Sequence, residues 1–217
     1  MQNPFIPPFG QLPASLPIFP LEGAVVMPGA QLPLNIFEPR YLNMVQDALA
    51  CHHLIGMIQP KSQSDALEIP LHHTGCAGRI TTYQETGDGR IEIVLSGVCR
   101  FDIQAELPTT RGYRLIVPEW NRFASDYEFP HFDKQRQQAR FFSLLDHYLR
   151  ANDLEIDESI IYKLSFSRLM NLLTTLLPLH HRDKQAIIET VSFDERYKLL
   201  ISQFELAGSG TPSHLRH

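Results

Sequence analysis

The alternation of hydrophobic and polar positions divides the chain into two parts. From about residue 15 to about residue 118, short apolar runs are separated by Gly and Pro, which is typical of strands joined by turns. From about residue 131 to about residue 206, apolar residues instead recur every three or four positions, which is typical of helices that bury one face. The sequence therefore predicts the α+β class, with a compact antiparallel β domain followed by a helical bundle.

A proline-rich segment, residues 16–41, organises the β-rich part. Proline has no backbone N–H and forces the preceding residue into an extended conformation, so this segment disfavours helix through most of its length. Three apolar runs are predicted to form short strands: residues 16–19, 24–27 and 32–37. We expect Phe19 and Phe37, which lie in these runs, to be core residues. A helix is predicted over residues 39–50, because Pro39 suits the first helical position.

The β pattern continues after this helix. Four further strands are predicted: residues 53–59, 75–83, 90–105 and 113–117. The glycine-rich turn at residues 87–89 predicts a hairpin between the second and third of them. Gly97 predicts a bulge within the third strand.

Composition shifts at the boundaries of the two parts. Residues 119–130 are interpreted as a linker. Residues 1–14 are proline-rich and are expected to form an extended arm, whereas residues 207–217 are expected to form a flexible tail. The predicted domains are therefore a β-rich subdomain over residues 15–118 and a helical subdomain over residues 131–206.

Four helices are predicted in the second part. Residues 133–150 are expected to form a long amphipathic helix and residues 157–164 a shorter one. Ser167 is a candidate N-cap for the third helix, which Pro178 ends. A capping box at residues 192–195 starts the last helix. The expected buried stripe of that helix contains Tyr197, Leu200, Ile201 and Phe204.

Two motifs resemble one known family. The opening, LPIFPLEGAVVMPGAQLPLNIFEPRY, is similar to the start of the Lon N-terminal domain, also called the Lon substrate-binding domain. The stretch LPLHHRDKQAIIETVSFDERYKLL resembles the closing pattern of that family, with Lys184-Gln185 and Glu195-Arg196 in register. The resemblance covers roughly residues 15–206. It implies a PUA-like pseudo-barrel packed with a helical bundle, and recognition of polypeptide, either unfolded or from a partner protein.

Full-length Lon proteases add an ATPase module and a peptidase with a Ser-Lys pair. The sequence contains no Gly-x-x-x-x-Gly-Lys-Ser/Thr phosphate loop and no Gly-x-Ser-x-Gly elbow. We therefore expect a free-standing Lon N-terminal domain that is not an enzyme and needs no cofactor. Two other functions stay open: a PUA-like module that binds RNA or a small ligand, and an enzyme with an unrecognised site.

Charge disfavours the nucleic-acid alternative. The formal net charge is −5, and residues 1–128 carry eight Lys/Arg against thirteen Asp/Glu, whereas a phosphate backbone requires a basic face. No window approaches the roughly 20 apolar residues of a membrane helix, and no secretory signal is recognised. The three cysteines are an odd number, which favours free thiols in the cytoplasm.

Metal and nucleophile sites are disfavoured as well. The histidines form adjacent pairs, at residues 52–53, 72–73 and 180–181. Adjacent residues on a strand point to opposite faces, so such a pair offers one ligand rather than two. No catalytic, cofactor or metal residue is predicted, and the cysteines are expected to be small core residues rather than reactive ones: Cys51, Cys76 and Cys99.

The candidate partner-binding residues are Pro28, Phe37, Arg40, Arg100, Trp120 and Phe123. Each of the two arginines stands in an otherwise apolar motif. The favoured interpretation is structural: the guanidinium ties loops together by binding carbonyl groups or a carboxylate such as Glu38. The apolar residues around Pro28 and Phe37 are expected mostly in the core, with some lining an exposed groove. The crevice between the two parts is the expected binding site.

Overall fold

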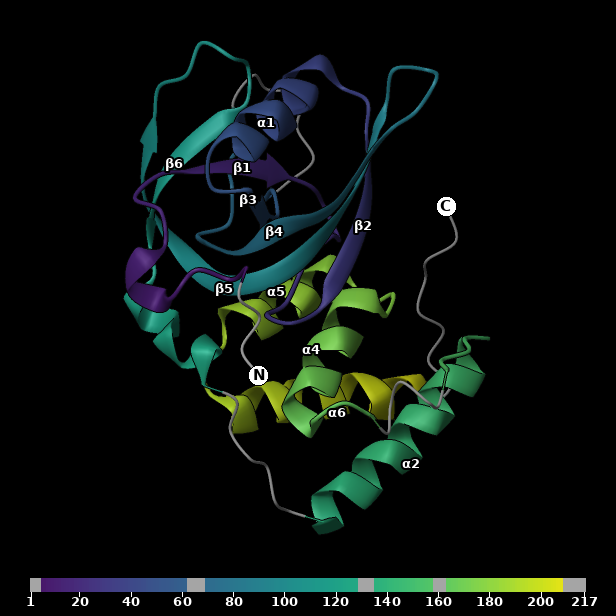
Figure 1. Ribbon diagram of the computed structural model, residues 1–217. Coiled ribbons are helices and arrows are strands. Elements are labelled where there is room, and N and C mark those ends of the chain that lie inside the picture. Colours follow the sequence, from purple (N-terminus) through teal and green to yellow (C-terminus); the bar gives the residue numbers. More distant parts are fainter. Residues whose placement is uncertain (1–4, 62–68, 129–134, 158–162, 209–217) are drawn as a thin grey trace.

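The computed structural model describes residues 5–61, 69–128, 135–157 and 163–208. The described residues form six strands: β1 (Leu16–Pro20), β2 (Gln31–Ile36), β3 (Leu54–Ile58), β4 (Thr74–Glu85), β5 (Ile91–Leu107) and β6 (Arg114–Glu119). They also form these helices: α1 (Pro39–Ala50), α2 (Gln135–Ala151), α4 (Phe166–Leu176), α5 (His181–Glu189), α6 (Phe193–Gly208), and the 3-10 helices η1 (Phe9–Gln11) and η2 (Asn121–Tyr127). Figure 1 shows a β barrel with α1 at one end and the C-terminal helices at the other.

The strands form one mixed sheet that closes into a barrel. Its order is β2-β5-β4-β3-β1-β6, and β5 also pairs with β6. The long strand β5 makes this closure, because its first half pairs with β2 and β4 and its second half with β4 and β6. The predicted pseudo-barrel is confirmed, but the sheet is not wholly antiparallel, since β1 and β3 run parallel. A parallel pair needs a crossover connection, and here β2 and α1 lie within that connection.

A β-bulge lies beside Gly97 in β5, as predicted. Two adjacent β4 residues lie opposite Cys99 and Gly97, which leaves Val98 as the extra residue. A Cβ atom on Gly97 would lie 2.1 Å from the carbonyl oxygen of Met27. Glycine is required here because the loop at residues 24–30 lies directly against the strand.

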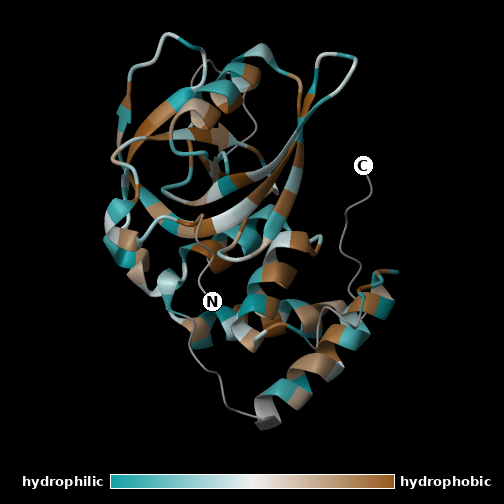
Figure 2. Cartoon of the chain, in the orientation of Figure 1, coloured by the Kyte–Doolittle hydropathy of each residue, from teal (hydrophilic) through white to brown (hydrophobic). Residues whose placement is uncertain are grey.

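Three hydrophobic clusters form the core. One lies between the barrel and α1 and includes the fully buried Met44 and Leu95. The second surrounds Phe101, on the side of the barrel that η2 covers. The third belongs to the bundle and includes Phe141 and Phe204. Figure 2 shows hydrophobic and hydrophilic residues alternating along the barrel strands, as expected for a sheet with one buried face.

The bundle helices mostly follow the predicted pattern. The predicted stripe of α6 is buried: Tyr197, Leu200, Ile201 and Phe204. This helix begins as predicted, with the N–H of Glu195 donating to Ser192 Oγ at 3.4 Å. The predicted cap of α4 is wrong, because Ser165 has the extended backbone of the N-cap and Ser167 is buried inside the first turn. The predicted helix over residues 157–164 lies largely outside the described residues.

Two segments differ from their predicted conformation. Residues 24–27 are buried loop rather than strand; their apolar side chains pack into the core without joining the sheet. Within the predicted linker, residues 121–127 form η2, which packs on β5 and buries Phe123 completely. The N-terminal arm lies against this helix, because Tyr127 donates its hydroxyl hydrogen to the carbonyl oxygen of Pro7 at 2.9 Å.

Candidate functional site

A groove of about 370 Å³ lies on the barrel surface beside β2. Its walls come from the end of β1, the outer part of β2, the start of α1 and the start of β6. Most of its lining is apolar, including Leu21 and Phe37, which are 37% and 60% exposed. β2 residues 33–35 also line a second hollow of about 390 Å³. Residues 33–35 of β2 therefore line both the groove and the second hollow.

The floor of the groove is aromatic. Phe19 and Tyr41 are 8% and 6% exposed, and their ring centroids are 4.3 Å apart. Burial raises the pKa of the Tyr41 hydroxyl above its usual value. The prediction that Phe19 is a core residue is confirmed.

The prediction that Phe37 is a core residue is wrong. Ile36, the last residue of β2, is 1% exposed, whereas Phe37 is 60% exposed. Successive side chains of an extended chain point to opposite sides, so the burial of Ile36 leaves Phe37 outside. The phenylalanine is held beside Arg90, whose guanidinium carbon lies 5.7 Å from the ring centroid.

One edge of β2 has no strand neighbour among the described residues. Within the described part of the chain, β2 pairs with β5 and with no other strand. Pro33 lies in the middle of this strand, a position that proline occupies at sheet edges because it cannot donate to a ladder. An edge strand presents backbone groups that can bind a further extended chain. The groove thus combines an apolar lining with an available strand edge.

The arginines at the rim of the groove pair with carboxylates. Arg40 lies 2.8 Å from Glu38, and both side chains are about half exposed. Arg114, which is about three-quarters buried, pairs with Glu106. Burial and a hydrogen bond to a nearby carboxylate, Asp47, raise the pKa of Tyr113 to about 12. Among the described residues, these pairs balance the positive charge at the rim, which favours a ligand bound through apolar and backbone contacts.

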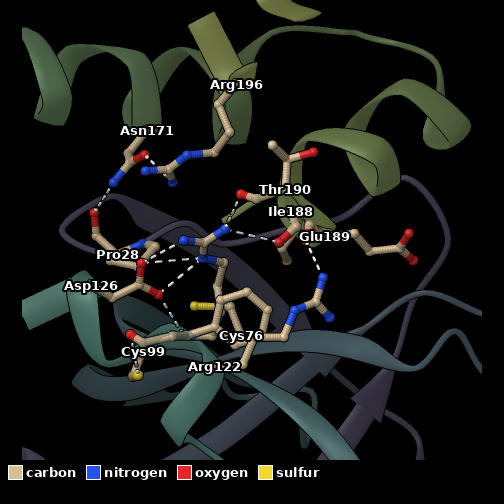
Figure 3. A network of polar contacts seen from close by, with 12 residues as sticks. Pro28, Cys76, Cys99, Arg122, Asp126, Asn171, Ile188, Glu189, Thr190 and Arg196 are labelled. Carbon is tan, nitrogen blue, oxygen red and sulfur yellow. Dashed lines mark hydrogen bonds and ion pairs between the residues drawn. The ribbon is translucent and has the colours of Figure 1, made fainter. Parts of the chain in front are cut away.

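A network of buried polar contacts joins the barrel to the bundle (Figure 3). The side chains of Arg100 on β5 and Asp126 on η2 are 0% and 3% exposed, with Nη2 2.7 Å from Oδ1. The guanidinium also donates to the carbonyl oxygens of Ile188 and Thr190, at 3.1 Å and 2.6 Å. Its central carbon lies 4.5 Å from the centroid of the Phe123 ring. Arg100 therefore links β5, η2 and the end of α5.

Further hydrogen bonds cross the same junction. Lys184 on α5 donates to the carbonyl oxygen of Gly23 at 3.1 Å, and burial lowers the pKa of this lysine. Asn171 on α4 donates to the carbonyl oxygen of Pro28 at 2.9 Å. The N–H of Met27 donates to Thr175 Oγ1 on α4 at 3.1 Å, and Glu22 lies 3.2 Å from His181 Nδ1 on α5. The loop at residues 21–30 is thus fixed to the bundle at several points.

The six predicted site residues do not converge on one site. Phe37 and Arg40 lie at the groove. Arg100 and Phe123 are fully buried, and Pro28 is buried as well. The sixth, Trp120, is half-buried and donates from Nε1 to a carbonyl oxygen of the N-terminal arm at 3.2 Å. The structural interpretation of Arg100 is confirmed, although its carboxylate partner is Asp126 rather than Glu38.

Sequence reasoning missed most of the groove. Its walls include Leu21, Pro33 and residues 112–114, which no motif marked as a site. The one available signal was Pro33, because a proline inside a strand pattern indicates a sheet edge.

The cysteines and the potential metal ligands were sequence-level candidates for reactive sites. Cys76 and Cys99 are buried, and burial raises the pKa of both thiols. Cys51 is exposed and carries a free thiol. Across residues 5–61, 69–128, 135–157 and 163–208, no three His, Cys, Asp or Glu side chains gather as metal ligands. In the same ranges, no helix has the length and apolar content needed to cross a membrane.

Comparison with known proteins places these features in context. Residues 15–204 match the family model of the substrate-binding domain of ATP-dependent protease La (LON). A Lon protease of Anaeromyxobacter dehalogenans is 26% identical over 196 residues, which are 88% of this chain and 23% of the relative. The human peroxisomal Lon protease homolog 2 is 24% identical over 213 residues, which are 88% of this chain and 24% of that protein. The chain therefore spans about a quarter of the length of these relatives.

Two solved structures share the fold. A Lon N-terminal domain protein from Xanthomonas campestris superimposes with a TM-score of 0.62 and 22% identity, covering 87% of this chain and 97% of the other. The N-terminal domain of the Mycobacterium avium complex Lon protease gives a TM-score of 0.62 and 18% identity, covering 93% of this chain and 100% of the other.

Proposed function

Because the chain belongs to the family of the Lon substrate-binding domain, we propose that it is a polypeptide-binding module without catalytic activity of its own. The family match covers the substrate-binding domain and not the ATPase or peptidase modules of full-length Lon proteases. The ligand class is an unfolded polypeptide or an extended segment of a partner protein. Neither a cofactor nor a metal has a part in this proposal.

The groove beside β2 is the proposed binding surface. The observation that carries this proposal is the 60% exposure of Phe37 beside an available strand edge. Exposed apolar side chains that gather in a groove are typical of interaction sites. An extended segment could pair with the edge of β2 while its alternate side chains enter the groove. Backbone pairing is independent of sequence, so this mode suits a module that accepts many polypeptides.

Salt dependence separates this proposal from RNA binding. Apolar contacts are not screened by salt, so binding should persist as ionic strength rises. Binding to a phosphate backbone releases counterions and weakens steeply with salt. The arginine–carboxylate pairs at the groove rim support the first behaviour.

The test compares two surface substitutions of the same kind. Phe37→Ser removes an exposed apolar side chain from the groove, and Leu176→Ser removes one that is 53% exposed on α4. The probe is fluorescein-labelled α-lactalbumin, reduced and carbamidomethylated so that it stays unfolded. We expect Phe37→Ser to weaken binding about tenfold, because complete burial of an aromatic side chain contributes about 1.5–3 kcal/mol and this one is 60% exposed before binding. Leu176→Ser should bind like the parent.

Three results would contradict the proposal. Equal binding by Phe37→Ser and the parent would exclude the groove. Tighter binding of a labelled RNA, lost at high salt, would favour a nucleic-acid function instead. Hydrolysis of ATP or of casein by repurified protein would show that the chain is an enzyme.

The cytoplasm is the proposed compartment. The three cysteines are free thiols in the structure, which suits a reducing environment. Fractionation of cells that express the tagged protein at its native level would test this assignment.

A further inference from the structure

A second cleft opens where the barrel meets the bundle. It has a volume of about 550 Å³ and lies between η2, the first turn of α4 and the first turn of α6. Pro28, Val191 and Phe193 give it an apolar wall, and Ser125 and Ser192 contribute hydroxyl groups. This cleft is separate from the groove beside β2, since the two share no lining residue.

Arg196 of α6 lines this cleft and lacks a full set of partners. The residue is 8% exposed, and its Nε is buried without a hydrogen-bond partner. Among the described residues its guanidinium makes one hydrogen bond, of 3.4 Å, from Nη1 to Asn171 Oδ1. Figure 3 shows the side chain reaching from α6 toward the barrel beside Asn171. A buried guanidinium with an unused donor is costly unless an acceptor reaches it.

The nearby carboxylate is already occupied. Asp126 also lines the cleft, but both of its oxygens accept hydrogen bonds from Arg100. Glu128 lies at the exposed rim and, within the described residues, has no ion pair with Arg196 within 4.0 Å. Burial and the charge of Arg100 lower the pKa of Arg196 to about 10, so the group stays cationic at neutral pH. At the inner end of the cleft, Arg196 therefore has no carboxylate of the described residues within ion-pair distance.

We propose that this cleft binds a carboxylate that is attached to an apolar group, with Arg196 as its counter-ion. A guanidinium binds a carboxylate through two parallel hydrogen bonds, which is the strongest arrangement available to it. Phe193 and Val191 would contact the apolar group, and the serine hydroxyls would donate to the remaining carboxylate lone pairs. The C-terminal residue of a polypeptide fits this description, because its carboxylate and side chain share one Cα atom. An acidic side chain beside an apolar one presents the same chemistry.

Three labelled pentapeptides test the proposal by fluorescence anisotropy. The first is Gly-Ser-Gly-Ala-Phe with a free C-terminal carboxylate, and the second is the same peptide as the amide. The third, Gly-Ser-Glu-Phe-Gly amide, carries only an internal carboxylate. We expect the parent to bind at least one carboxylate peptide about tenfold more tightly than the amide, which corresponds to about 1.4 kcal/mol. The peptide that binds more tightly identifies the source of the carboxylate, C-terminal or internal. A preference for either carboxylate peptide supports the site.

Two variants assign the preference to Arg196. Arg196→Met should abolish it by removing the cation. Val191→Glu should abolish the preference as well, because it places a competing carboxylate on the cleft wall while Arg196 stays in place. This second variant keeps the test valid if Arg196→Met fails to fold. Leu176→Glu, an exposed site on α4 outside the cleft, is the matched control and should keep the preference.

The proposal is overturned if the parent binds all three peptides equally or binds none. It is also overturned if the preference persists in both Arg196→Met and Val191→Glu. Phe37→Ser should leave the preference unchanged, because it alters the other groove. Failure of the groove proposal and failure of this one are therefore distinguishable.

Discussion

The groove beside β2 and the junction between the barrel and the bundle differ in which side chains are buried. At the groove, Phe37 is exposed and the ion pair of Arg40 and Glu38 lies in solvent. At the junction, the ion pair of Arg100 and Asp126 is almost completely buried. An exposed pair contributes little to stability, whereas removal of one member of a buried pair leaves an uncompensated charge.

This difference indicates which surface is available to a polypeptide. The donors of Arg100 are used by the protein itself, on Asp126 and on backbone carbonyls. Among the described residues, the groove leaves apolar area exposed and one edge of β2 without a strand partner. Residue type alone therefore does not indicate position: Arg100, in an otherwise apolar motif, is buried and ties elements together, whereas Phe37, in an apolar run, is exposed.

The buried pair should produce the largest loss of stability. Arg100→Met leaves the Asp126 carboxylate buried without its cation, so we expect the free energy of unfolding to fall by about 3–5 kcal/mol. Arg40→Met, the matched change in the exposed pair, should cost about 0–1 kcal/mol. Urea unfolding followed by circular dichroism measures both. Equal losses for the two variants would show that the junction pair is not the stronger constraint.

A second pair of substitutions compares two phenylalanines. Phe19→Ala should lower the free energy of unfolding by about 3–5 kcal/mol, because it opens a cavity in the barrel. Phe37→Ala should change it by about 0.5 kcal/mol or less, as expected at an exposed position. Thermal or urea unfolding gives both values. A large loss for Phe37→Ala would mean that this side chain belongs to the core after all.

Glycine substitutions test the contact between β5 and the loop at residues 24–30. In Gly97→Ala the new Cβ would lie 2.1 Å from the carbonyl oxygen of Met27, and such overpacking costs about 1–3 kcal/mol. Gly87→Ala, in the β4–β5 hairpin, meets no atom within 4 Å and should be neutral or slightly stabilising. Urea unfolding measures the stability of both variants. Equal free energies of unfolding for Gly97→Ala and Gly87→Ala would contradict the close contact between Gly97 and Met27.

The smallest effect concerns Tyr113 at the rim of the groove. Burial, followed by its hydrogen bond to Asp47, raises the pKa of this tyrosine to about 12 from 10.0. Because the folded pKa lies above the unfolded value, the stabilisation is complete below pH 10.0 and is lost as the pH rises toward 12. Absorbance titration at about 295 nm, as a difference between the parent and Tyr113→Phe, measures this pKa.

Asp47→Asn should lower the pKa of Tyr113 only in part, because burial is the larger cause. A return to the ordinary value would show that Asp47 alone is responsible. No change at all would show that the hydrogen bond does not form in solution.

Local signals predicted much of the fold. Pro39 and the helical spacing after it predicted α1, and the turn at residues 87–89 predicted the hairpin between β4 and β5. Ser192 predicted the start of α6. Each of these features depends on neighbouring residues in the sequence, so no knowledge of distant contacts was needed.

The features that sequence reasoning missed depend on distant contacts. Arg100 binds Asp126, 26 residues later, and carbonyl groups 88 and 90 residues later. The parallel pairing of β1 with β3 follows from a crossover that includes β2 and α1. The groove exists because β2 has one strand neighbour among the described residues. None of these arrangements follows from local spacing, which is why the site was only partly predicted.

Hydrogen exchange during polypeptide binding tests the central claim most directly. The ligand is an unfolded peptide of apolar and neutral polar residues with an amidated C-terminus, so that it carries no carboxylate for the junction cleft. We predict slower amide exchange in segments that span residues 31–41 and 112–114, which border the groove. Segments that span residues 121–127 and 188–196 should be unchanged. Protection confined to the junction segments, or binding without protection at residues 31–41, would contradict the assignment of the groove as the polypeptide-binding surface.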